Sequence, residues 1–593
     1  MIFYDFEVTK HDWLTVLIDP DKEDPMVVIN NRERLEQIYQ EYKHDIWIGY
    51  NNRHYDQYIM KAILCDLSAW EMNKHIIIDG NAGWTFSDLL KNIFMINYDT
   101  ILLNKSLKQL EGFQGHNIHE SSIDFNIDRP LKKSEIDEMV RYCENDVKET
   151  MNIFAANIDD FKAVMGLVKE FGFPLSYMSK TKAQISAEIL ECVPEERTDE
   201  FDLYPLDCLR LLKRGQWLTV KEKKNKEQDL NISDKVKGKV YMCPEDWFMD
   251  PIYQNYRLYF ETYVAKVLHV FAWGGLHGGV KKYHYKCDPD HLLIHVDVAS
   301  YYPSLMIYHD LLTRNARKPD LFKEIYDKRL KLKREGKKKE QAPLKIVLNG
   351  TYGICKDKNN RAYDPRNANL VCVNGQLLLL DLIQKLERVK SFELIQSNTD
   401  GLIIKCKRSD FEQVDDICYE WETRTHMNLE FDYIREIWQK DVNNYVFIQY
   451  DGKVERKGAY VKELNAMDND LPIVNKAVID FMLNEINPEE TVMKCDSYVM
   501  FQKICKLTNK YDYVTHNGKK YTNKCFRIFA SKLDSDGAVQ KVKEKENRRD
   551  KFSNTSIHSF IENGDITNEY PPDYLDRNYY VEMAKERLKQ YGC

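Results

Sequence analysis

The sequence predicts a mixed α/β and α+β protein built from several domains. Its 593 residues exceed what one hydrophobic core usually serves, and about three to five domains suit that length. The chain opens on a strand pattern, "MIFYDFEV", and mixed strand and helix patterns follow it. A second apolar strand, "HLLIHVDV" at 291–298, opens another region that mixes strands with helices. Two separate α/β regions are therefore expected in one chain.

Cap and turn residues mark three further elements. A helix is expected over 134–154, with Ser134 as its N-cap, and another over 179–190. The stretch "ELIQSNTDGLIIK" at 393–405 places a tight polar turn between two apolar runs, which predicts a hairpin. A Lys-rich stretch at 221–239 is expected to be a polar loop or insertion, and the last 130 or so residues are expected to be mostly helical.

Composition limits the class of protein. No run of about 18 apolar residues is present, and the acidic N-terminus lacks the pattern of a signal peptide, so a cytoplasmic protein without membrane contact is expected. The 14 cysteines form no CxxC pair, which favours reduced thiols over a zinc site. Net charge is −8, yet 328–339 and 541–551 are dense in Lys and Arg. These runs are either solvated faces or phosphate-binding surfaces.

Acidic residues in the first segment follow a pattern typical of metal-dependent phosphodiesterases. Asp5 and Glu7 lie two apart on the expected strand, so both carboxylates share a face. Their mutual repulsion and burial are compensated if a divalent cation binds, although a wet strand face is the simpler alternative. Asp56 follows in "NNRHYDQ", and Tyr142 and Asp146 share one face of the expected helix. Four carboxylates suit a two-metal site.

The first segment resembles the proofreading 3′→5′ exonucleases. The stretch "DFE", then Asn-x-x-Tyr-Asp, then Tyr-x-x-x-Asp stand in the order of the three motifs of that class. The resemblance implies that the four carboxylates hold two metal ions and that Tyr142 orients the attacking water.

A second group of motifs follows. Asp297 ends the expected strand at 291–298, and "SYYPS" turns away from it. Lys345, Asn349 and Tyr352 have the spacing of one helical face, and Asp400 lies in the hairpin turn. Taken singly, these are also compatible with a proline turn and with an amphipathic helix that ends near Gly353.

Together the motifs resemble family B DNA polymerases. Asp-x-x-Ser-x-Tyr-Pro-Ser is similar to motif A, Lys-x-x-x-Asn-x-x-Tyr-Gly to motif B, "TDG" to motif C, and "KGAY" at 457–460 to the later Lys-x-Tyr motif. The resemblance implies an RNase H-like exonuclease domain joined to a right-hand polymerase. The implied domains are 1–165 exonuclease, 166–245 linker with the Lys-rich insertion, 246–312 palm, 313–356 fingers, 357–465 palm and 466–593 thumb.

The resemblance also implies residue roles. Two Mg²⁺ ions per active site, replaceable by Mn²⁺, would be held in the polymerase by Asp297, Asp400 and the backbone of Val298, and Lys345 would neutralise charge on the phosphates. The implied nucleotide-binding residues are Ser300, Tyr301, Tyr302, Arg329, Lys333, Lys345, Asn349 and Tyr352. The implied DNA-binding residues are Gly274, Gly275, Gly353, Thr399, Lys457 and Tyr460.

Four positions depart from the family pattern. They are Asn398 in place of the first acid of motif C, Gly350 in motif B, Tyr301 in motif A, and Ala272 before the glycine pair. The intervals between motifs, 298–344 and 350–399, hold 47 and 50 residues and leave no room for the insertions of protein-primed phage enzymes. A compact phage or prophage replicase that extends a nucleic-acid primer is therefore expected.

The expected function is template-directed DNA synthesis with proofreading, by a monomer that binds primer–template DNA and dNTPs. Whether replisome proteins bind it stays open at this point. One alternative is a DNA exonuclease or repair nuclease whose polymerase half only holds DNA. Another is a noncatalytic single-strand binding scaffold. A reverse transcriptase is disfavoured because its hairpin carries adjacent aspartates.

Overall fold

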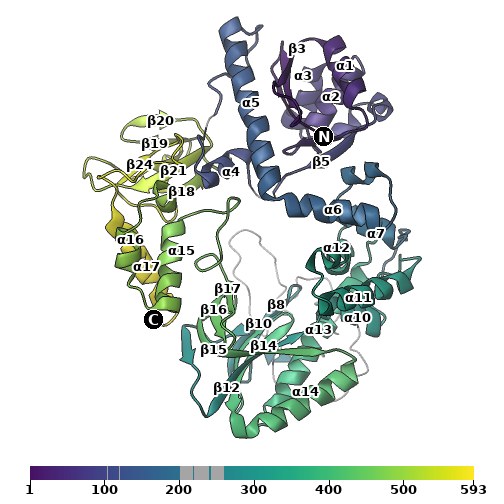
Figure 1. Cartoon of the computed structure of the whole chain (residues 1–593), viewed down its shortest axis with the longest axis vertical. Helices are drawn as coiled ribbons and strands as arrows, with labels where there is room; N and C mark the ends of the chain where they lie inside the picture. Colours follow the sequence, from purple (N-terminus) through teal and green to yellow (C-terminus); the bar gives the residue numbers. More distant parts are fainter. Residues whose placement is uncertain (103–104, 119, 201–202, 204–217, 220–239, 242–258) are drawn as a thin grey trace. The chain divides into compact units, whose positions relative to one another are not determined.

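Two structural units make up the chain, each assembled from distant segments (Figure 1). The computed structural model describes all residues except 103–104, 119, 201–202, 204–217, 220–239 and 242–258. The first unit comprises Met1–Thr181 with Glu463–Ala584, and the second comprises Lys182–Lys462 with Lys585–Cys593. The predicted Lys-rich insertion at 221–239 lies outside the described residues. The mixed α/β multidomain architecture is confirmed.

A five-stranded mixed sheet forms the centre of the first unit. Its order is β3-β2-β1-β4-β5, with β1 antiparallel to β2 and parallel to β4, which is the arrangement expected of an RNase H-like sheet. The strands are β1 (Ile2–Val8), β2 (Trp13–Ile18), β3 (Met26–Ile29), β4 (Ile46–Gly49) and β5 (Ile96–Asp99). The strand expected at the start of the chain is therefore β1.

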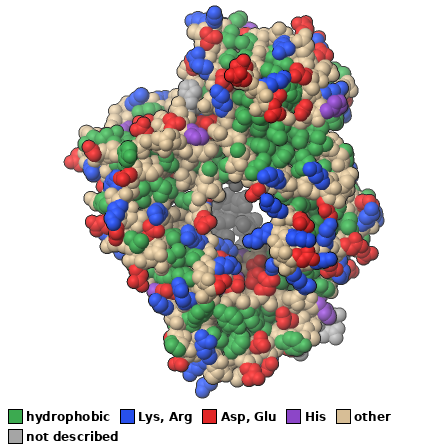
Figure 2. Space-filling view, viewed as in Figure 1, with side chains coloured by type: hydrophobic (Ala, Val, Ile, Leu, Met, Phe, Trp, Pro, Cys, Tyr) green, Lys and Arg blue, Asp and Glu red, His purple; other side chains and the backbone are tan. Residues whose placement is uncertain are grey.

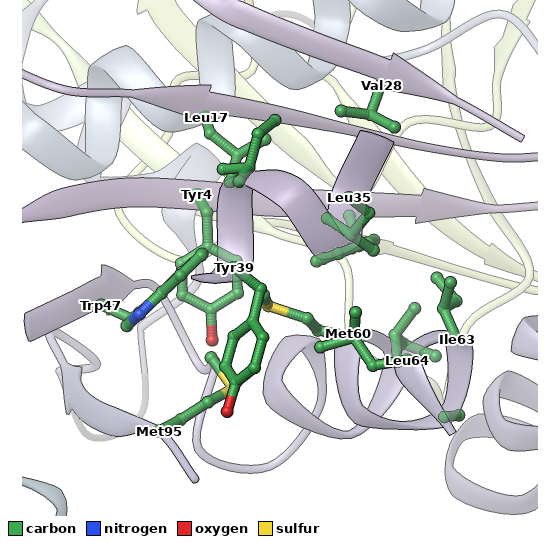
Figure 3. Packing of buried hydrophobic residues seen from close by; sticks show 14 of the residues in the cluster. Tyr4, Leu17, Val28, Leu35, Tyr39, Trp47, Met60, Ile63, Leu64 and Met95 are labelled. Atoms are coloured by element: carbon green, nitrogen blue, oxygen red, sulfur yellow. The ribbon is translucent and has the colours of Figure 1, made fainter. Parts of the chain in front are cut away.

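The helices that lie between β3 and β5 in the sequence bury one core with this sheet. They are α1 (Arg32–Tyr42), α2 (Asp56–Leu64) and α3 (Ala69–Asn73), with the short turns η1 (Lys74–Ile78), η2 (Gly83–Thr85) and η3 (Asp88–Asn92). After β5 come α4 (Leu107–Gln114), α5 (Lys133–Ala156), α6 (Ile158–Glu170) and the turn η4 (Leu175–Ser179). Tyr4 and Trp47 from the sheet meet Leu35 and Met60 from the helices (Figure 3). Each such large side chain, once buried, contributes roughly 1.5–3 kcal/mol to folding.

The expected N-cap of α5 was wrong. The helix begins at Lys133, and Glu135 accepts a hydrogen bond from the Lys132 backbone N–H at 2.7 Å. Arg129 holds the same carboxylate through two contacts of 2.7 Å. Glu135 therefore fixes the start of the helix in place of the Ser134 hydroxyl.

The expectation of a mostly helical C-terminal region was also wrong. Its strands are β18 (Lys503–Lys506), β19 (Tyr513–His516), β20 (Lys519–Tyr521), β21 (Cys525–Ala530), β22 (Gln540–Lys543), β23 (Arg548–Lys551) and β24 (Ser559–Ile561). They form one sheet of order β18-β21-β24 and another of order β20-β19-β22-β23. A shared core that includes Val514, Phe526 and Phe552 joins them. The helices are α15 (Pro472–Asn484), α16 (Pro488–Met493) and α17 (Arg577–Gln590), with the turn η7 (Tyr498–Phe501).

An antiparallel ten-stranded sheet forms the centre of the second unit. Its main order is β17-β16-β15-β12-β14-β13-β10-β9-β8, and β11 pairs with β15. The strands are β8 (Tyr259–Val264), β9 (Val267–Ala272), β10 (Gly275–Gly279), β11 (Tyr283–Lys286), β12 (His291–Val298), β13 (Glu393–Asn398), β14 (Gly401–Lys407), β15 (Leu429–Asp441), β16 (Asn444–Gln449) and β17 (Val454–Lys457). A separate pair joins β6 (Leu218–Thr219) to β7 (Val240–Tyr241). The predicted strand at 291–298 and the predicted hairpin, now β13–β14, are both confirmed.

The described helices of the second unit lie before and after the acid-bearing strand β12. Helix α7 (Lys182–Ile189) precedes the sheet, and α10 (Tyr301–Tyr308), α11 (Pro319–Arg334), α12 (Lys338–Ile354), α13 (Pro365–Leu386) and α14 (Phe411–Thr425), with the turn η6 (Arg408–Asp410), follow β12. The basic run at 328–339 thus spans α11 and the start of α12, and Lys and Arg side chains gather over these helices in Figure 2. Among the described residues, no helix is long and apolar enough to cross a membrane.

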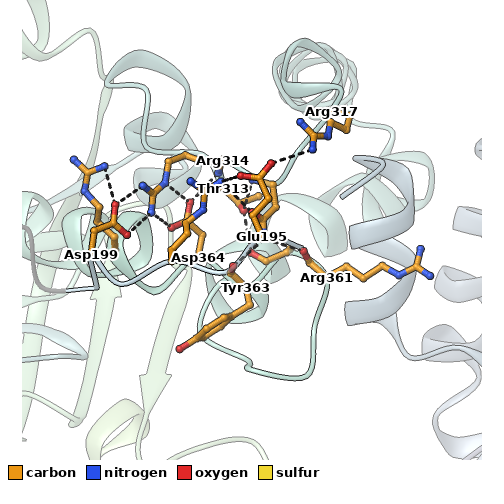
Figure 4. A network of polar contacts seen from close by, with 12 residues as sticks. Glu195, Asp199, Thr313, Arg314, Arg317, Arg361, Tyr363 and Asp364 are labelled. Carbon is orange, nitrogen blue, oxygen red and sulfur yellow. Dashed lines mark hydrogen bonds and ion pairs between the residues drawn. The ribbon is translucent and has the colours of Figure 1, made fainter. Parts of the chain in front are cut away.

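An ion-pair network ties the segment after α10 to the start of α13 (Figure 4). Arg314 donates to the fully buried carboxylate of Asp364 at 2.6 Å and to Asp199 at 2.6 Å. Burial opposes ionisation of Asp364, but the hydrogen bonds from Arg314 outweigh it and hold the pKa of that carboxyl below its usual range. Asp364 is also the N-cap residue of α13.

Arg314→Met should therefore destabilise the protein by about 3–5 kcal/mol, since it leaves a buried carboxylate without its partner. Arg317→Met is the matched control: its ion pair with Glu195, 3.0 Å long, is about half exposed, and its loss should cost about 0–1 kcal/mol. Denaturant unfolding measures both. Equal losses of unfolding free energy in the two variants would show that the ion pair of Arg314 with buried Asp364 stabilises the protein no more than an exposed one.

Two candidate active sites

The first candidate site lies on strand β1. Asp5 and Glu7 both belong to this strand, and Glu7 is only 9% exposed. Between them, the Phe6 backbone N–H donates to Asp56 Oδ1 at 3.1 Å, which holds the start of α2 against β1. Ligand atoms of Asp5, Glu7 and Cys143 lie within 4.8 Å of one another. The strand and α2 together therefore bring three of the expected carboxylates to one place.

The loop before Asp56 is held by side chains at the end of β5. Asp99 accepts hydrogen bonds from the backbone N–H groups of Asn51 and Arg53, at 2.9 and 3.1 Å. Asn52 is fully buried, and its side-chain amide nitrogen donates to Asn97 Oδ1 at 2.9 Å. These bonds fix the chain that leads into α2 and thus the position of Asp56.

A lysine that the sequence reasoning missed completes this site. Tyr142 and Asp146 lie on α5, and the Lys108 ammonium group is 2.5 Å from Asp146 and 4.6 Å from the centre of the Tyr142 ring. Lys108 also contacts Glu111, one turn further along α4, at 2.9 Å. The i,i+3 spacing of Lys108 and Glu111 was visible in the sequence, but nothing local indicated that α4 packs beside Asp146.

Burial makes these carboxylates resist ionisation. Burial and then the charges of neighbouring acids raise the pKa values of Asp5 and Glu7 well above their usual range. Burial raises the pKa of Asp56 to about 7 and that of Glu111 to about 8. It also raises the pKa of Asp146, although the Lys108 charge opposes this shift. Crowded carboxylate oxygens are the ligands that Mg²⁺ and Mn²⁺ prefer, so the donor set fits the expected metals.

The second candidate site lies where β12 meets the β13–β14 hairpin. Asp297 is paired with Gly401 across the sheet, and the Val298 backbone N–H donates to the Asp400 carbonyl oxygen at 2.8 Å. A Cβ atom on Gly401 would lie 3.0 Å from Asp297 Oδ1. The absence of a side chain at Gly401 therefore leaves room for the Asp297 carboxylate beside Asp400.

The turn of the hairpin is held against the start of β10. Thr399 adopts a left-handed conformation with φ of 61°, and its N–H donates to the Leu276 carbonyl oxygen at 3.0 Å. Gly275, which follows Gly274, has φ of 128°, and a Cβ there would lie 3.1 Å from Thr399 Oγ1. Gly275 thus allows β10 to approach the residue next to Asp400.

The hydrogen bonds of Asn398 explain why no acid stands at that position. Its amide nitrogen donates to the Val442 carbonyl oxygen at 3.2 Å, and its amide oxygen lies 3.1 Å from His277 Nδ1. An aspartate carboxylate has no N–H to donate to Val442. Asn398 therefore connects the hairpin to β10 and to the β15–β16 turn.

Three more acids surround Asp297, and the sequence reasoning missed all of them. Glu430 lies opposite Asp297 on β15, with Asp432 further along that strand and Glu455 on β17. Burial, followed by the charges of Asp400 and these three acids, raises the pKa of Asp297 to about 7. Desolvation by the surrounding protein also raises the pKa of Asp400. Oxygen ligands of this kind fit a divalent cation.

Two predicted nucleotide-binding residues on α11 contact this region. Arg329 Nη1 donates to Ser300 Oγ at 2.8 Å, and Lys333 Nζ binds Glu430 at 2.8 Å. Ser300 is the N-cap of α10, with φ of 52°. Helix α11 is thereby joined to the N-cap of α10 and to the acid-bearing strand β15.

The tyrosines of motif A take two different positions. Tyr301 is buried, and its hydroxyl donates to the Gly375 carbonyl oxygen at 2.5 Å, so its side chain is not available to a ligand. The ring of Tyr302 packs against Tyr352 of α12, with centroids 4.5 Å apart. On α12, Lys345 and Asn349 are exposed.

The remaining predicted residues lie at the edges of the second unit. Gly353 is exposed on α12, and a Cβ added there would meet no described atom within 4 Å. Lys457 ends β17, and its charge acts on Asp400. The Tyr460 ring lies between Lys440 Nζ at 4.7 Å and the Arg587 guanidinium at 4.2 Å.

Comparisons of sequence and of structure with known proteins both find DNA polymerases. No family model matches. DNA polymerase 1 of Sulfolobus acidocaldarius is 24% identical over 200 residues, which are 33% of this chain. The chain is similar to a DNA polymerase in sequence. It resembles the family B DNA polymerases in its motifs. The matched part spans 22% of the Sulfolobus protein.

The solved structure of the family B DNA polymerase from Pyrobaculum calidifontis aligns with a TM-score of 0.40 and 13% identity. The alignment covers 100% of this chain and 77% of that one.

Both sites should make the stability of the metal-free protein fall as pH rises. Asp56 and Asp297 have pKa values of about 7, above the ordinary value near 4, so the folded state binds more protons than the unfolded state between roughly pH 4 and 7. Their contribution to the free energy of unfolding is therefore present below pH 4 and lost as pH rises through 7. Denaturant unfolding of the wild type and of Asp297→Asn, in EDTA, isolates the effect of that residue.

We expect the wild type to lose stability relative to Asp297→Asn between pH 5 and pH 8. Mg²⁺ should restore stability to the wild type at pH 8 and much less at pH 5, because the ion replaces the proton. A wild type that gains stability over the variant as pH rises would contradict the assignment.

Proposed function

We propose that the protein is a template-directed DNA polymerase of family B type that adds dNTPs to a primer 3′-OH. The supporting observation is the pair Asp297 and Asp400, which the backbone hydrogen bond from Val298 N–H to the Asp400 carbonyl oxygen and the pairing of β12 with β14 place side by side. Their raised pKa values mark a place where negative charge needs a cation. Two Mg²⁺ ions, with Mn²⁺ as a substitute, would there lower the pKa of the primer hydroxyl and bind the triphosphate.

Other residues would bind and orient the substrates. Lys345 and Arg329 would bind the phosphates of the incoming nucleotide, and Tyr302 would pack against its sugar. Because Lys333 is paired with Glu430, it would reach the phosphates only by exchanging that partner. Val298 would offer its backbone oxygen to the metal. The template–primer contacts are assigned to Gly274, Gly275, Gly353, Thr399, Lys457 and Tyr460, and the nascent base pair to Asn349 and Tyr352.

We also propose a 3′→5′ exonuclease in the first unit. Asp5, Glu7, Asp56 and Asp146 would hold its metals, which supply a hydroxide nucleophile and stabilise the leaving oxygen. Tyr142 would orient the attacking water. Lys108, whose ammonium group binds Asp146, would place positive charge where negative charge builds up on the phosphate.

The proposed domains keep the boundaries expected from the sequence, with the thumb at 466–593. We further propose a compact phage-type enzyme that uses a nucleic-acid primer and works as a monomer on primer–template DNA. The alternative is a DNA nuclease whose polymerase half mainly binds DNA, and the two variants below separate these functions.

Asp400→Asn should abolish extension of a labelled primer–template in Mg²⁺ and all four dNTPs, because it removes a proposed metal ligand. Asn398→Asp, two residues away, is the matched control and should keep extension within about tenfold, or roughly 1.4 kcal/mol of barrier. Full activity of Asp400→Asn together with inactivity of Asn398→Asp would show that the metal assignment in this hairpin is wrong. Absence of extension by the wild type in Mg²⁺ and in Mn²⁺ would favour the nuclease alternative.

Asp5→Ala should abolish shortening of a single-stranded primer without dNTPs while leaving extension intact, since the two metal sites belong to different units. Gel analysis of both reactions on one preparation makes extension the folding control. If shortening survives in Asp5→Ala, the proposed nuclease site is wrong.

A further inference from the structure

The C-terminal region contacts the helix that carries Lys108. Strands β18 and β21 pack on α4, and Ile504 and Cys525 share a core with Leu110 and Phe113. A Cβ on Gly112 would lie 2.9 Å from Ile504 Cδ1, so α4 approaches β18 as closely as a glycine permits. The contact lies within the first structural unit.

Side chains of the C-terminal region donate hydrogen bonds to the carbonyl oxygens at the end of α4. The Arg527 guanidinium donates to the carbonyl oxygens of Gly112 and His116, at 3.3 and 2.6 Å. Gln502 Nε2 and Asn469 Nδ2 each donate to the Phe113 carbonyl oxygen at 3.0 Å. Carbonyl groups at a helix C-terminus lack partners within the helix and carry partial negative charge. These three side chains, which we call the α4 clamp, supply both hydrogen bonds and positive charge.

Arg527 is unusual in its surroundings. Its side chain is fully buried, and its hydrogen-bond acceptors among the described residues are carbonyl oxygens and the amide oxygen of Gln502 at 3.1 Å. The charges of Glu562 and Asp565 act on it, but no described carboxylate accepts a hydrogen bond from it. Burying a cation without a directly bound acid is costly. The carbonyl groups at the end of α4 and the Gly564 carbonyl oxygen at 2.5 Å offset that cost. The buried charge of Arg527 is therefore directed at the C-terminal end of α4.

The helix itself is too short to hold its own position. It has eight residues, and isolated helices of that length are marginal in water. Lys108 and its partner Glu111 both lie on it, while the other partner of Lys108, Asp146, belongs to α5. A shift at the C-terminal end of α4 would thus move the Lys108 ammonium group away from Asp146.

We propose that Arg527, Gln502 and Asn469 are positioning residues of the nuclease site, which hold α4 so that Lys108 lies between Asp146 and Glu111. The proposal rests on the proposed nuclease function. It gives the C-terminal region a role in hydrolysis at the other end of the chain, besides any contact with DNA. None of the three touches a reacting atom; they act through Lys108.

A double-mutant cycle tests this route. Arg527→Met should lower kcat for shortening a single-stranded oligonucleotide about tenfold, with KM changed less than twofold, and Arg527→Lys should recover part of the loss. In a Lys108→Met background, Arg527→Met should change kcat less than twofold. Equal effects in both backgrounds would overturn the proposal.

Arg577→Met is the matched control. This arginine binds the carbonyl oxygens of Val492, Met493 and Cys495 at the end of α16, at 3.1, 2.8 and 2.8 Å, so it closes a different helix of the same region. It should leave kcat within twofold. A tenfold fall in this variant would mean that general loosening of the region explains the effect, which would overturn the proposal.

Hydrogen exchange of peptides covering 105–117 gives a readout independent of activity. Arg527→Met should speed exchange in α4, and Arg577→Met should not; unchanged exchange in Arg527→Met overturns the clamp even if the wild type has no nuclease activity. If the wild type does not shorten the oligonucleotide, or if Asp5→Ala shortens it equally well, the proposed nuclease function is refuted instead. If Arg527→Met does not fold, as judged by primer extension and thermal melting, Gln502→Met and Asn469→Ala, whose side chain is only partly buried, decide by the same criteria.

Discussion

Repulsion between buried carboxylates is the constraint on which both sites depend. Asp5, Glu7, Asp56 and Asp146 crowd together in one unit, and Asp297, Asp400 and their neighbours do so in the other. Folding buries these groups and brings them close together, and first the burial and then the neighbouring charges raise their pKa values. Protons relieve the repulsion at low pH, and divalent cations can relieve it at neutral pH. The same crowding that lowers the stability of the protein at neutral pH is what would favour binding of a divalent cation.

The two sites answer this constraint differently. In the proposed nuclease site, Lys108 of the short helix α4 brings a positive charge to within 2.5 Å of Asp146. In the proposed polymerase site, the charge of Lys457 on β17 acts on Asp400, and Lys333 and Arg329 of α11 bind Glu430 and Ser300. The position of the positive charge in the first site depends on the packing of α4, and in the second it depends on β17 and on how α11 meets the sheet.

Backbone geometry matters as much as charge at the β13–β14 hairpin. Gly401 leaves space for Asp297, Gly275 lets β10 approach Thr399, and Asn398 binds Val442 and His277. An amide serves at position 398 because both a donor and an acceptor are needed there. The departure from the family pattern is thereby explained by local hydrogen bonding.

Local pattern in the sequence was sufficient for β1, for β12 and for the β13–β14 hairpin, because alternation and turn residues report on neighbours along the chain. The same periodicity placed Asp5 with Glu7, and Tyr142 with Asp146. It failed for the C-terminal sheets, whose strands are short and Lys-rich, and for the start of α5, which Arg129 and Glu135 determine.

Tertiary structure alone decided which residues meet. Glu430 faces Asp297 through the register of β15 against β12, Lys108 reaches Asp146 through packing of α4 on α5, and Arg527 reaches α4 from more than 400 residues away. Sequence periodicity carries no information on such contacts, because register and packing depend on chain segments that are remote in sequence. The sequence by itself therefore determined the motifs and their order, while the fold determined the charges that surround them.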